Sequence, residues 1–600
     1  MKIRIILSLL ALLTFTGCDL EETPQHTANK NVIFGTESGL QLYANSFYEW
    51  LPSANNVHSA DAISDYSARR NVPDFLRGDV YNSRANDNTS ASGYSLVALG
   101  SDWNWGWGSL RNINYFIVNN ENPAIPEAVR RHYTGLARFF RAWFYFEKVK
   151  RYGDVPWIDK PLDVSDPKLF EGQDSRTLVM DKVLEDLDYA IANIQTVSDA
   201  SRTLITKDVA LALKARVALF EGTFRKYHTD KGLTATANTW LEHARSAAKT
   251  IIDGGRYRLN TSGGTDLAYR NLFIADAPNA TEIMLSVVSS VSLAVRHDAN
   301  WWYTSSTTGT RFSFIRPFIH TYLNLDGTPF TDTPGYATKS FAEETKNRDK
   351  RLQQTIRTPG YTRLNGANRV AAPPAFTYTY TGYQPIKWTT DDVAADGGTN
   401  NVNAVSLFRY AEVLLNYAEA KAELGSLTNE DWALTIGALR GRAGITGGLQ
   451  TLPAKVDTYL KATYFPDISD PVILEIRRER GIELAMEGFR FYDVVRWKRG
   501  ELFTMPWHGI YIAEANKLVD LNGDGVNDVF FYTTTPPSQV SGVTYINVNT
   551  ETQRLTGGTS GQITWLDNIP KTFTTRNYLY PIPETHLLTN TNLKQNPGWN

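Results

Sequence analysis

Cysteine is almost absent from this chain, whose 600 residues contain only Cys18. A single cysteine forms no internal disulfide, so packing and polar contacts alone must hold the fold together. The sequence also lacks an excess of either charge, with 61 Lys and Arg against 63 Asp and Glu and a formal net charge of −2. This balance argues against nucleic acid and against an anionic membrane surface as partners.

Recognisable catalytic motifs are missing as well. The sequence has no G-x-S-x-G, no H-E-x-x-H and no phosphate-binding loop, and its nine histidines lack the spacing of metal ligands. A glycosidase needs two carboxylates that flank the bond it cleaves, and 63 acidic residues leave room for such a pair. We therefore predict that the protein is not an enzyme, with a glycoside hydrolase as the weaker alternative.

The one long apolar run lies at the N-terminus. Lys2 and Arg4 precede apolar residues 5–13, a run too short to span a bilayer and typical of a secretory signal. Small residues then lead into Cys18 (TFTGC), as in the lipobox of bacterial lipoproteins. We expect residues 1–17 to be a signal peptide and Cys18 to carry acyl chains such as palmitate. The alternative is an ordinary secretory peptide with an incidental cysteine.

Charged residues are densest between Asp470 and Trp497 (DPVILEIRRERGIELAMEGFRFYDVVRW). Asp470 can cap a helix, Pro471 fits its first position, and apolar residues follow at helical spacing. Acids and bases three residues apart would face each other: Arg480 with Glu483, Glu487 with Arg490, and Asp493 with Arg496. A catalytic carboxylate pair is one interpretation. A buried ion-pair framework is favoured, because every acid here has a basic neighbour.

Helical periodicity elsewhere predicts a mostly α-helical protein. The clearest segment is 128–149, with one continuous apolar stripe and Gly153 in position for a C-terminal cap. Other predicted helices are 38–50, 103–120, 177–194, 207–225, 240–254 and 406–424. Several resemble the helix pairs of tetratricopeptide-type repeats. Between 257 and 402 the periodicity fades as Gly, Thr, Pro and aromatic residues increase, which predicts a loop-rich insert.

Six segments, in this order, resemble motifs of the SusD/RagB-like family of lipid-anchored nutrient-binding proteins of Bacteroidetes. They are 141–158 (RAWFYFEKVKRYGDVPWI), 406–424 (SLFRYAEVLLNYAEAKAEL), 438–444 (ALRGRAG), 479–497 (ERGIELAMEGFRFYDVVRW), 578–584 (YLYPIPE) and 595–599 (QNPGW). The resemblance implies one domain over 18–600. Its tetratricopeptide-like frame would cover about 30–256 and 404–500, with a variable ligand-binding insert at about 257–403 and a C-terminal segment at 501–600.

The resemblance also implies a function. Family members capture a polysaccharide or oligosaccharide at the outer membrane and deliver it to a SusC-like TonB-dependent transporter. The acidic residues Asp19, Glu21 and Glu22 resemble the tag that sends Bacteroidetes lipoproteins to the outer face of the membrane. A family member that captures peptides is the alternative.

Aromatic residues are abundant, with 15 Trp and 30 Tyr, and flat rings suit the C–H faces of sugars. Three adjacent rings inside the insert, Trp301 to Tyr303, cannot all face one core, so we expect at least one to face solvent or a ligand. The alternative is that two of them fix the insert to the frame. Polar residues of the loop 61–70 (DAISDYSARR) would bind sugar hydroxyls. The predicted glycan-binding residues are Trp301, Trp302, Tyr303, Asp61, Asp65, Tyr66, Arg69 and Trp388.

One segment, 520–528 (DLNGDGVND), matches the first half of a calcium loop. The predicted ligands are Asp520, Asn522, Asp524 and Asp528, with glycine at position 6 for the turn. Position 12 is Phe531 where a bidentate Glu is expected. A structural calcium site completed from elsewhere and a polar turn that binds nothing are both open. No other cofactor is predicted.

Overall fold

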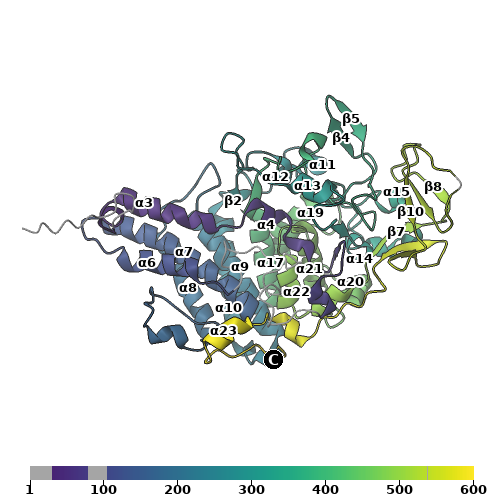
Figure 1. Ribbon diagram of the computed structural model, residues 1–600. Coiled ribbons are helices and arrows are strands. Elements are labelled where there is room, and N and C mark those ends of the chain that lie inside the picture. The colour runs from purple at the N-terminus through teal and green to yellow at the C-terminus, as the bar shows by residue number, and fades with distance from the viewer. Residues whose placement is uncertain (1–29, 79–104, 537, 600) are drawn as a thin grey trace, which may run out of the picture.

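The computed structural model describes residues 30–78, 105–536 and 538–599. The predicted signal peptide 1–17 and the predicted lipidation site Cys18 lie outside the described residues. Within them, no helix is both long enough and apolar enough to cross a membrane. Figure 1 shows an elongated molecule, with long helices at one end and strands β7, β8 and β10 at the other.

The fold is mostly helical, as predicted, and its first part is a frame of long helices. These are α3 (Glu37–Ser46), α6 (Gly108–Asn119), α7 (Glu127–Tyr152), α8 (Arg176–Asn193), α9 (Lys207–Tyr227) and α10 (Ala237–Gly254). Consecutive helices pack side by side, α7 on α8 and α9 on α10, in the manner of tetratricopeptide-type repeats. Helix α7 ends at Gly153, whose φ of 77° is one that glycine adopts readily.

The frame continues with α17 (Tyr410–Glu423), α21 (Pro471–Glu483) and α22 (Arg490–Arg496). Asp470 caps α21 as predicted, because its side chain accepts a hydrogen bond from Val472 N at 2.8 Å. The segment 470–497 is nevertheless not one helix. A turn separates α21 from α22, and both Met486 and Gly488 have positive φ, 64° and 83°. Backbone amides and carbonyls of this turn form hydrogen bonds with residues that are distant in the sequence.

The predicted helix 406–424 also needs a correction. Its first residues belong to strand β6 (Val405–Arg409), which pairs antiparallel with β2 (Ile283–Val287). All five residues of β6 are buried. A short, fully buried run does not reveal its period, so sequence alone does not separate strand from helix here.

The region between β2 and β6 contains short elements joined by loops, among them α13 (Ala299–Thr304) and the hairpin β4 (Thr362–Asn365) with β5 (Asn368–Ala371). Strand β3 (Ser313–Phe314) pairs antiparallel with β1 (Ser67–Ala68). This pairing fixes the 61–70 segment against the insert.

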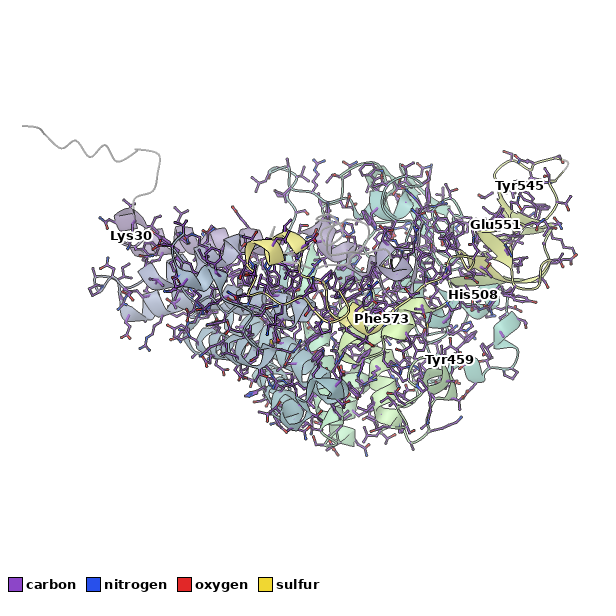
Figure 2. The ribbon with its side chains drawn as sticks, turned by 60° about the horizontal axis from the view of Figure 1, so that its bottom comes forward. Lys30, Tyr459, His508, Tyr545, Glu551 and Phe573 are labelled. Atoms are coloured by element: carbon purple, nitrogen blue, oxygen red, sulfur yellow. The ribbon has the colours of Figure 1, made fainter. Side chains whose placement is uncertain are left out.

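Two three-stranded sheets form much of the C-terminal segment, in the orders β11–β12–β7 and β10–β9–β8. Their strands are β7 (His508–Ile512), β8 (Lys517–Val519), β9 (Val529–Tyr532), β10 (Thr544–Asn547), β11 (Gln553–Leu555) and β12 (Gly561–Trp565). Figure 2 shows Tyr545 and Glu551 of this part at the opposite end of the molecule from Lys30.

Candidate functional site

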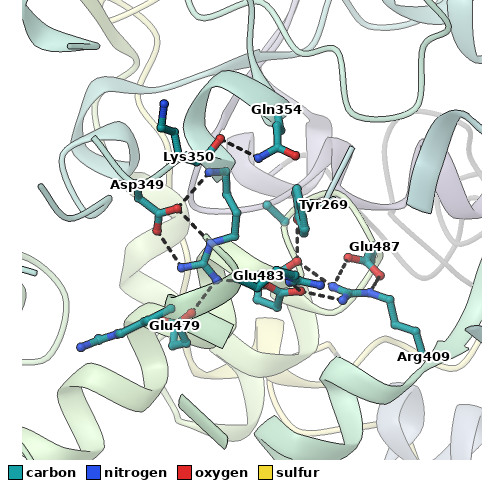
Figure 3. A network of polar contacts seen from close by, with 12 residues as sticks. Tyr269, Asp349, Lys350, Gln354, Arg409, Glu479, Glu483 and Glu487 are labelled. Carbon is teal, nitrogen blue, oxygen red and sulfur yellow. Dashed lines mark hydrogen bonds and ion pairs between the residues drawn. The ribbon is translucent and has the colours of Figure 1, made fainter. Parts of the chain in front are cut away.

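The acids of the 470–497 segment form a buried ion-pair framework (Figure 3). Glu483 Oε1 accepts hydrogen bonds from Arg409 Nη1 at 2.6 Å and from Arg442 Nη2 at 2.5 Å, and its Oε2 accepts one from Arg351 Nη1 at 2.8 Å. Burial alone would raise the pKa of Glu483, but these three guanidinium groups outweigh it and hold the pKa well below its ordinary value. A carboxylate held this way is not a proton donor for catalysis.

Of the three ion pairs predicted between residues three apart, only Asp493 with Arg496 is present. Asp493 and Arg496 pair at 2.9 Å, and Arg480 bonds to Asp493 as well, at 2.8 Å. The other acids and bases find partners far away in the sequence: Glu483 as above, Glu487 with Lys387 and Arg409, and Arg490 with Asp65. Burial explains the difference, because a buried charge must be matched in three dimensions and not along one helix face.

The three adjacent rings of the insert lie in α13 and have different surroundings. Tyr303 is only 3% exposed, and its hydroxyl donates a hydrogen bond to the carbonyl of His58. Trp302 is half-buried and packs on the core, whereas Trp301 is half-buried without being part of that packing. Tyr303 thus fixes the insert to the frame in this structure. Trp301 and Trp302 stay candidates for contact with a ligand.

Gly309 lies directly against the Trp302 ring. A Cβ at this position would come within 2.8 Å of ring atom Cδ2, and the φ of Gly309 is 66°. Only glycine combines that approach with that backbone conformation at low cost. The 305–311 loop therefore holds Trp302 in place from one side.

The loop 61–70 points inward, contrary to our expectation. Asp61 Oδ2 accepts hydrogen bonds from the Tyr66 hydroxyl at 2.7 Å and from Gly488 N at 3.0 Å. Asp65 binds Arg490 through both carboxylate oxygens. All three side chains, Asp61, Asp65 and Tyr66, are 2% exposed or less, so in this structure none can contact a glycan. Their polarity serves buried contacts with the 486–490 turn.

Trp388 is likewise misassigned as a binding residue. Its side chain is fully buried, its Nε1 donates to the carbonyl of Met486 at 2.8 Å, and its ring packs edge-on against Phe273. A ring without exposed surface offers no face to a sugar. Arg69, the last predicted residue of the loop, is 8% exposed and bonds weakly to the carbonyl of Ala62, at 3.5 Å.

Sequence reasoning missed the residues that lie beside α13 in space. Tyr380 and Trp565 stack with ring centroids 3.9 Å apart and planes at 14°. Trp565 Nε1 donates to the carbonyl of Arg69 at 2.8 Å, and the Arg311 guanidinium lies 4.3 Å from the Tyr380 ring centre. We use the name α13 surface for the half-buried residues Trp301, Trp302, Arg70, Arg311 and Trp565, together with the buried Arg69 and Tyr380 that Trp565 and Arg311 contact. No local signal links Arg69 to Trp565, which are 496 residues apart.

A cleft with a volume of about 460 Å³ opens elsewhere, between the 327–332 turn and the 451–458 segment. Trp432, Arg440 and Glu475 contribute to its walls. None of the predicted glycan-binding residues lines it.

The predicted calcium loop connects β8 to β9 and is held by its own hydrogen bonds. Asp520 accepts from Gly523 N at 2.7 Å and from Gly525 N at 2.8 Å, and Asp524 accepts from Val526 N at 2.8 Å. Asp528 accepts from Leu521 N. In the described parts of the chain, no group of three or more His, Cys, Asp or Glu side chains is arranged to hold a metal ion. The structure thus gives the calcium prediction no support.

Comparison with known proteins places these features in context. Residues 281–599 match the SusD family, and residues 54–212 match a family described as starch-binding and associating with the outer membrane. SusD-like protein P2 of Formosa agariphila is 24% identical over 525 residues, which cover 83% of this chain and 92% of that protein. SusD-like protein P38 of the same organism is 26% identical over 404 residues, which cover 63% of this chain and 69% of that protein.

Solved structures share the fold. A SusD-like protein from Bacteroides fragilis superposes with a TM-score of 0.67 at 23% identity, covering 95% of this chain and 98% of its own. A SusD-like carbohydrate-binding protein from the same species has a TM-score of 0.65 at 20% identity, covering 94% and 100%. Identities this low establish the architecture and leave ligand and partners open.

Proposed function

The chain belongs to the SusD family, and we propose on this basis that it is a cell-surface glycan-binding lipoprotein. It captures a polysaccharide or oligosaccharide at the outer membrane and delivers it to a SusC-like TonB-dependent transporter. The family match over more than half of the chain carries this proposal. The second match, to a family described as starch-binding and outer-membrane-associated, supports it.

The α13 surface is where we propose that the sugar binds. Trp301 and Trp302 are half-exposed indoles, and a sugar ring can lay its C–H face on such a ring with little loss of side-chain entropy. Burying apolar area at about 25 cal/mol per Å² makes one indole worth more than a typical single hydrogen bond. Gly309 and the core packing hold the Trp302 ring in position before the ligand arrives, which reduces the ordering cost of binding.

The anchor in this proposal is acylated Cys18. An attached lipid would keep the protein at the membrane while the folded part stays in water.

A binding role is favoured over a hydrolytic one by the state of the signature acids. Glu479 and Glu483 are fully buried and bond to arginines within the core, so no substrate reaches their carboxylates. Capture of peptides remains the alternative within the family.

The proposal is tested by pull-down of the purified protein with soluble plant, fungal and host polysaccharides, alongside a tryptic peptide mixture. We expect at least one polysaccharide to be retained, with no new reducing ends above a boiled control. Retention of peptides and no glycan would replace glycan capture with peptide capture. New reducing ends on a bound polysaccharide would overturn the binding-only role.

A further inference from the structure

The β1–β3 pairing brings the segment that contains Arg69 and Arg70 alongside the segment that contains Arg311. Arg69 and Arg70 follow β1, and Arg311 precedes β3 on the opposite strand. Arg70 N donates to the carbonyl of Thr310 at 2.8 Å, and its Nη2 donates to the carbonyl of Ser306 at 2.8 Å. These bonds hold Arg70 against the 305–311 loop, which contains Arg311 and packs on Trp302, while the neighbouring Arg69 bonds inward to Ala62.

Among the residues that the structure describes, none of these three arginines forms an ion pair with an acid. Their described side-chain hydrogen bonds go to neutral oxygens: Arg69 to Ala62 O, Arg70 to Ser306 O, and Arg311 to Tyr380 Oη and Phe376 O. The buried arginines of the core contrast with them, as Arg409 binds three carboxylates. The acid that acts most on Arg69 is Asp74, which is half-exposed and lies 3.9 Å from Arg77. In the described part of the chain, the positive charges of Arg70 and Arg311 thus have no carboxylate partner.

The same surface has hydrogen-bond donors without acceptors. Arg69 Nε, Arg311 Nε and Trp302 Nε1 are buried and find no partner in the described structure, and the same holds for Thr310 Oγ1. Each of the three N–H groups can only donate. Arg69 is more than nine-tenths buried, so its missing acceptor costs the fold more than it would at an open surface. Because these atoms are buried, a ligand reaches the cluster through the exposed parts of Arg70 and Arg311, whose positive charge suits a ligand rich in anionic oxygens.

Burial also disfavours the charged form of Arg69, because desolvation lowers the pKa of its guanidinium to about 10. Arg70 and Arg311 remain half-exposed and therefore reachable. Their planar groups can bind a carboxylate or sulfate through two parallel hydrogen bonds, while Trp301 and Trp302 take the sugar faces.

We propose that the α13 surface selects acidic polysaccharides, whose sugars carry carboxylate or sulfate groups. This inference rests on the proposed function, because it names the substrate class for the same surface. The shared chemistry is a sugar chain with regularly spaced anionic oxygens.

The test uses matched pairs of polymers that differ in charge alone. Polygalacturonate is compared with its carboxyl-reduced form, and dextran sulfate with dextran, by isothermal titration calorimetry in 50 mM and 300 mM NaCl. Polyglutamate controls for attraction to charge without sugar. We expect at least tenfold tighter binding to one acidic polymer than to its neutral counterpart, weakening with salt, and no comparable binding of polyglutamate. The two pairs separate a carboxylate from a sulfate ligand.

The variant Arg70→Gln/Arg311→Gln should lose at least tenfold in affinity for the acidic polymer. Arg131→Gln, which removes one exposed cation from α7, should not. The single variant Arg70→Gln is used if the double variant melts at lower temperature. Equal binding of neutral polymers, equal binding of polyglutamate, or equal loss in Arg131→Gln would each overturn the inference. Neutral glycans retained in the pull-down while both acidic polymers fail would also overturn it and leave the proposed function standing. If no glycan binds at all, the proposed function of glycan capture is wrong.

Discussion

Arg490 clamps Asp65 with two parallel hydrogen bonds, from Nε to Oδ1 and from Nη2 to Oδ2, both at 2.7 Å, across a separation of 425 residues. Both side chains are buried. The contact ties the 61–70 loop to the turn between α21 and α22, and the same loop continues into Arg69 and Arg70. The ion-pair framework of the core therefore helps to position Arg69 and Arg70, because it holds the loop that precedes them.

The first prediction follows from this contact. Asp65→Asn leaves the buried Arg490 without its charge partner, which typically costs about 3–5 kcal/mol. We expect a clearly lower melting temperature and urea midpoint. The control is Asp74→Asn, whose side chain is 48% exposed and lies 3.9 Å from Arg77, so it should change stability by less than about 1 kcal/mol. Similar melting of both variants would contradict a structural role for Asp65.

The second prediction concerns pH. Burial raises the pKa of Asp61 from 3.8 to about 6, although bonds from Tyr66 and Gly488 act in the other direction. The folded protein thus holds this proton more tightly than the unfolded chain, so Asp61 destabilises the fold progressively as pH rises from about 4 to about 6. Asp61→Asn removes that penalty, up to about 3 kcal/mol for a shift of roughly two pKa units.

We therefore expect the melting temperature of Asp61→Asn, relative to wild type, to be higher at pH 7.5 than at pH 5. The comparison between variants matters because the strongly paired acids of the core change stability in the opposite sense at low pH. Glu419, whose pKa lies at about 2 because the guanidinium groups of Arg496 and its neighbours outweigh burial, is one of them. A difference that does not change with pH would show that Asp61 is already neutral, or already stabilised, at pH 7.5.

Much of the fold could be predicted from local patterns in the sequence. The limits of α7 follow from an apolar stripe and a terminal glycine, features set by residues within a few turns of each other. Strand β6 and the turn at Met486 were missed, because a buried run of residues shows no period and a positive φ at a non-glycine residue has no local signal. In both places tertiary contacts decide the local structure.

The site was harder to predict for a related reason. The polar letters of DAISDYSARR suggested an exposed loop, but Asp61 and Asp65 have partners at Gly488 and Arg490, more than 400 residues away. Trp565 joins the α13 surface through Arg69 from an equally distant position. Sequence reasoning located the rings of α13 because they are adjacent. It had no means to identify neighbours that only the fold brings together.

The third prediction tests the anchor. Cys18→Ala should be lost from the outer-membrane fraction after a high-salt wash, because the thiol that would carry the acyl chains is gone. Cell fractionation with immunodetection measures this, and Gln25→Ala serves as a control in the same segment. Retention of Cys18→Ala in the washed outer membrane would contradict lipid anchoring at this residue.

The last prediction separates the three rings of α13. Tyr303→Ala removes a buried ring and its hydrogen bond to His58, and core truncations of this size typically cost about 3–5 kcal/mol, so its melting temperature should fall clearly. Trp301→Ala should leave melting almost unchanged, because Trp301 is outside the core packing. It should instead weaken affinity for the polysaccharide found by pull-down at least tenfold, about 1.4 kcal/mol. Trp302→Ala should affect both quantities, since Trp302 packs on the core and is also half-exposed.

Melting and affinity are measured on the same preparations, so that loss of fold and loss of contact are distinguished for each ring. Wild-type affinity in both Trp301→Ala and Trp302→Ala would move the ligand site away from α13, and the cleft lined by Trp432 would become the next surface to test. Loss of affinity only in Tyr303→Ala, together with lower melting, would mean that the rings support the fold and do not touch the sugar. Weaker polysaccharide binding by Trp301→Ala at an unchanged melting temperature would mean that the Trp301 ring contacts the ligand. The reason is that Trp301 is half-exposed and lies outside the core packing.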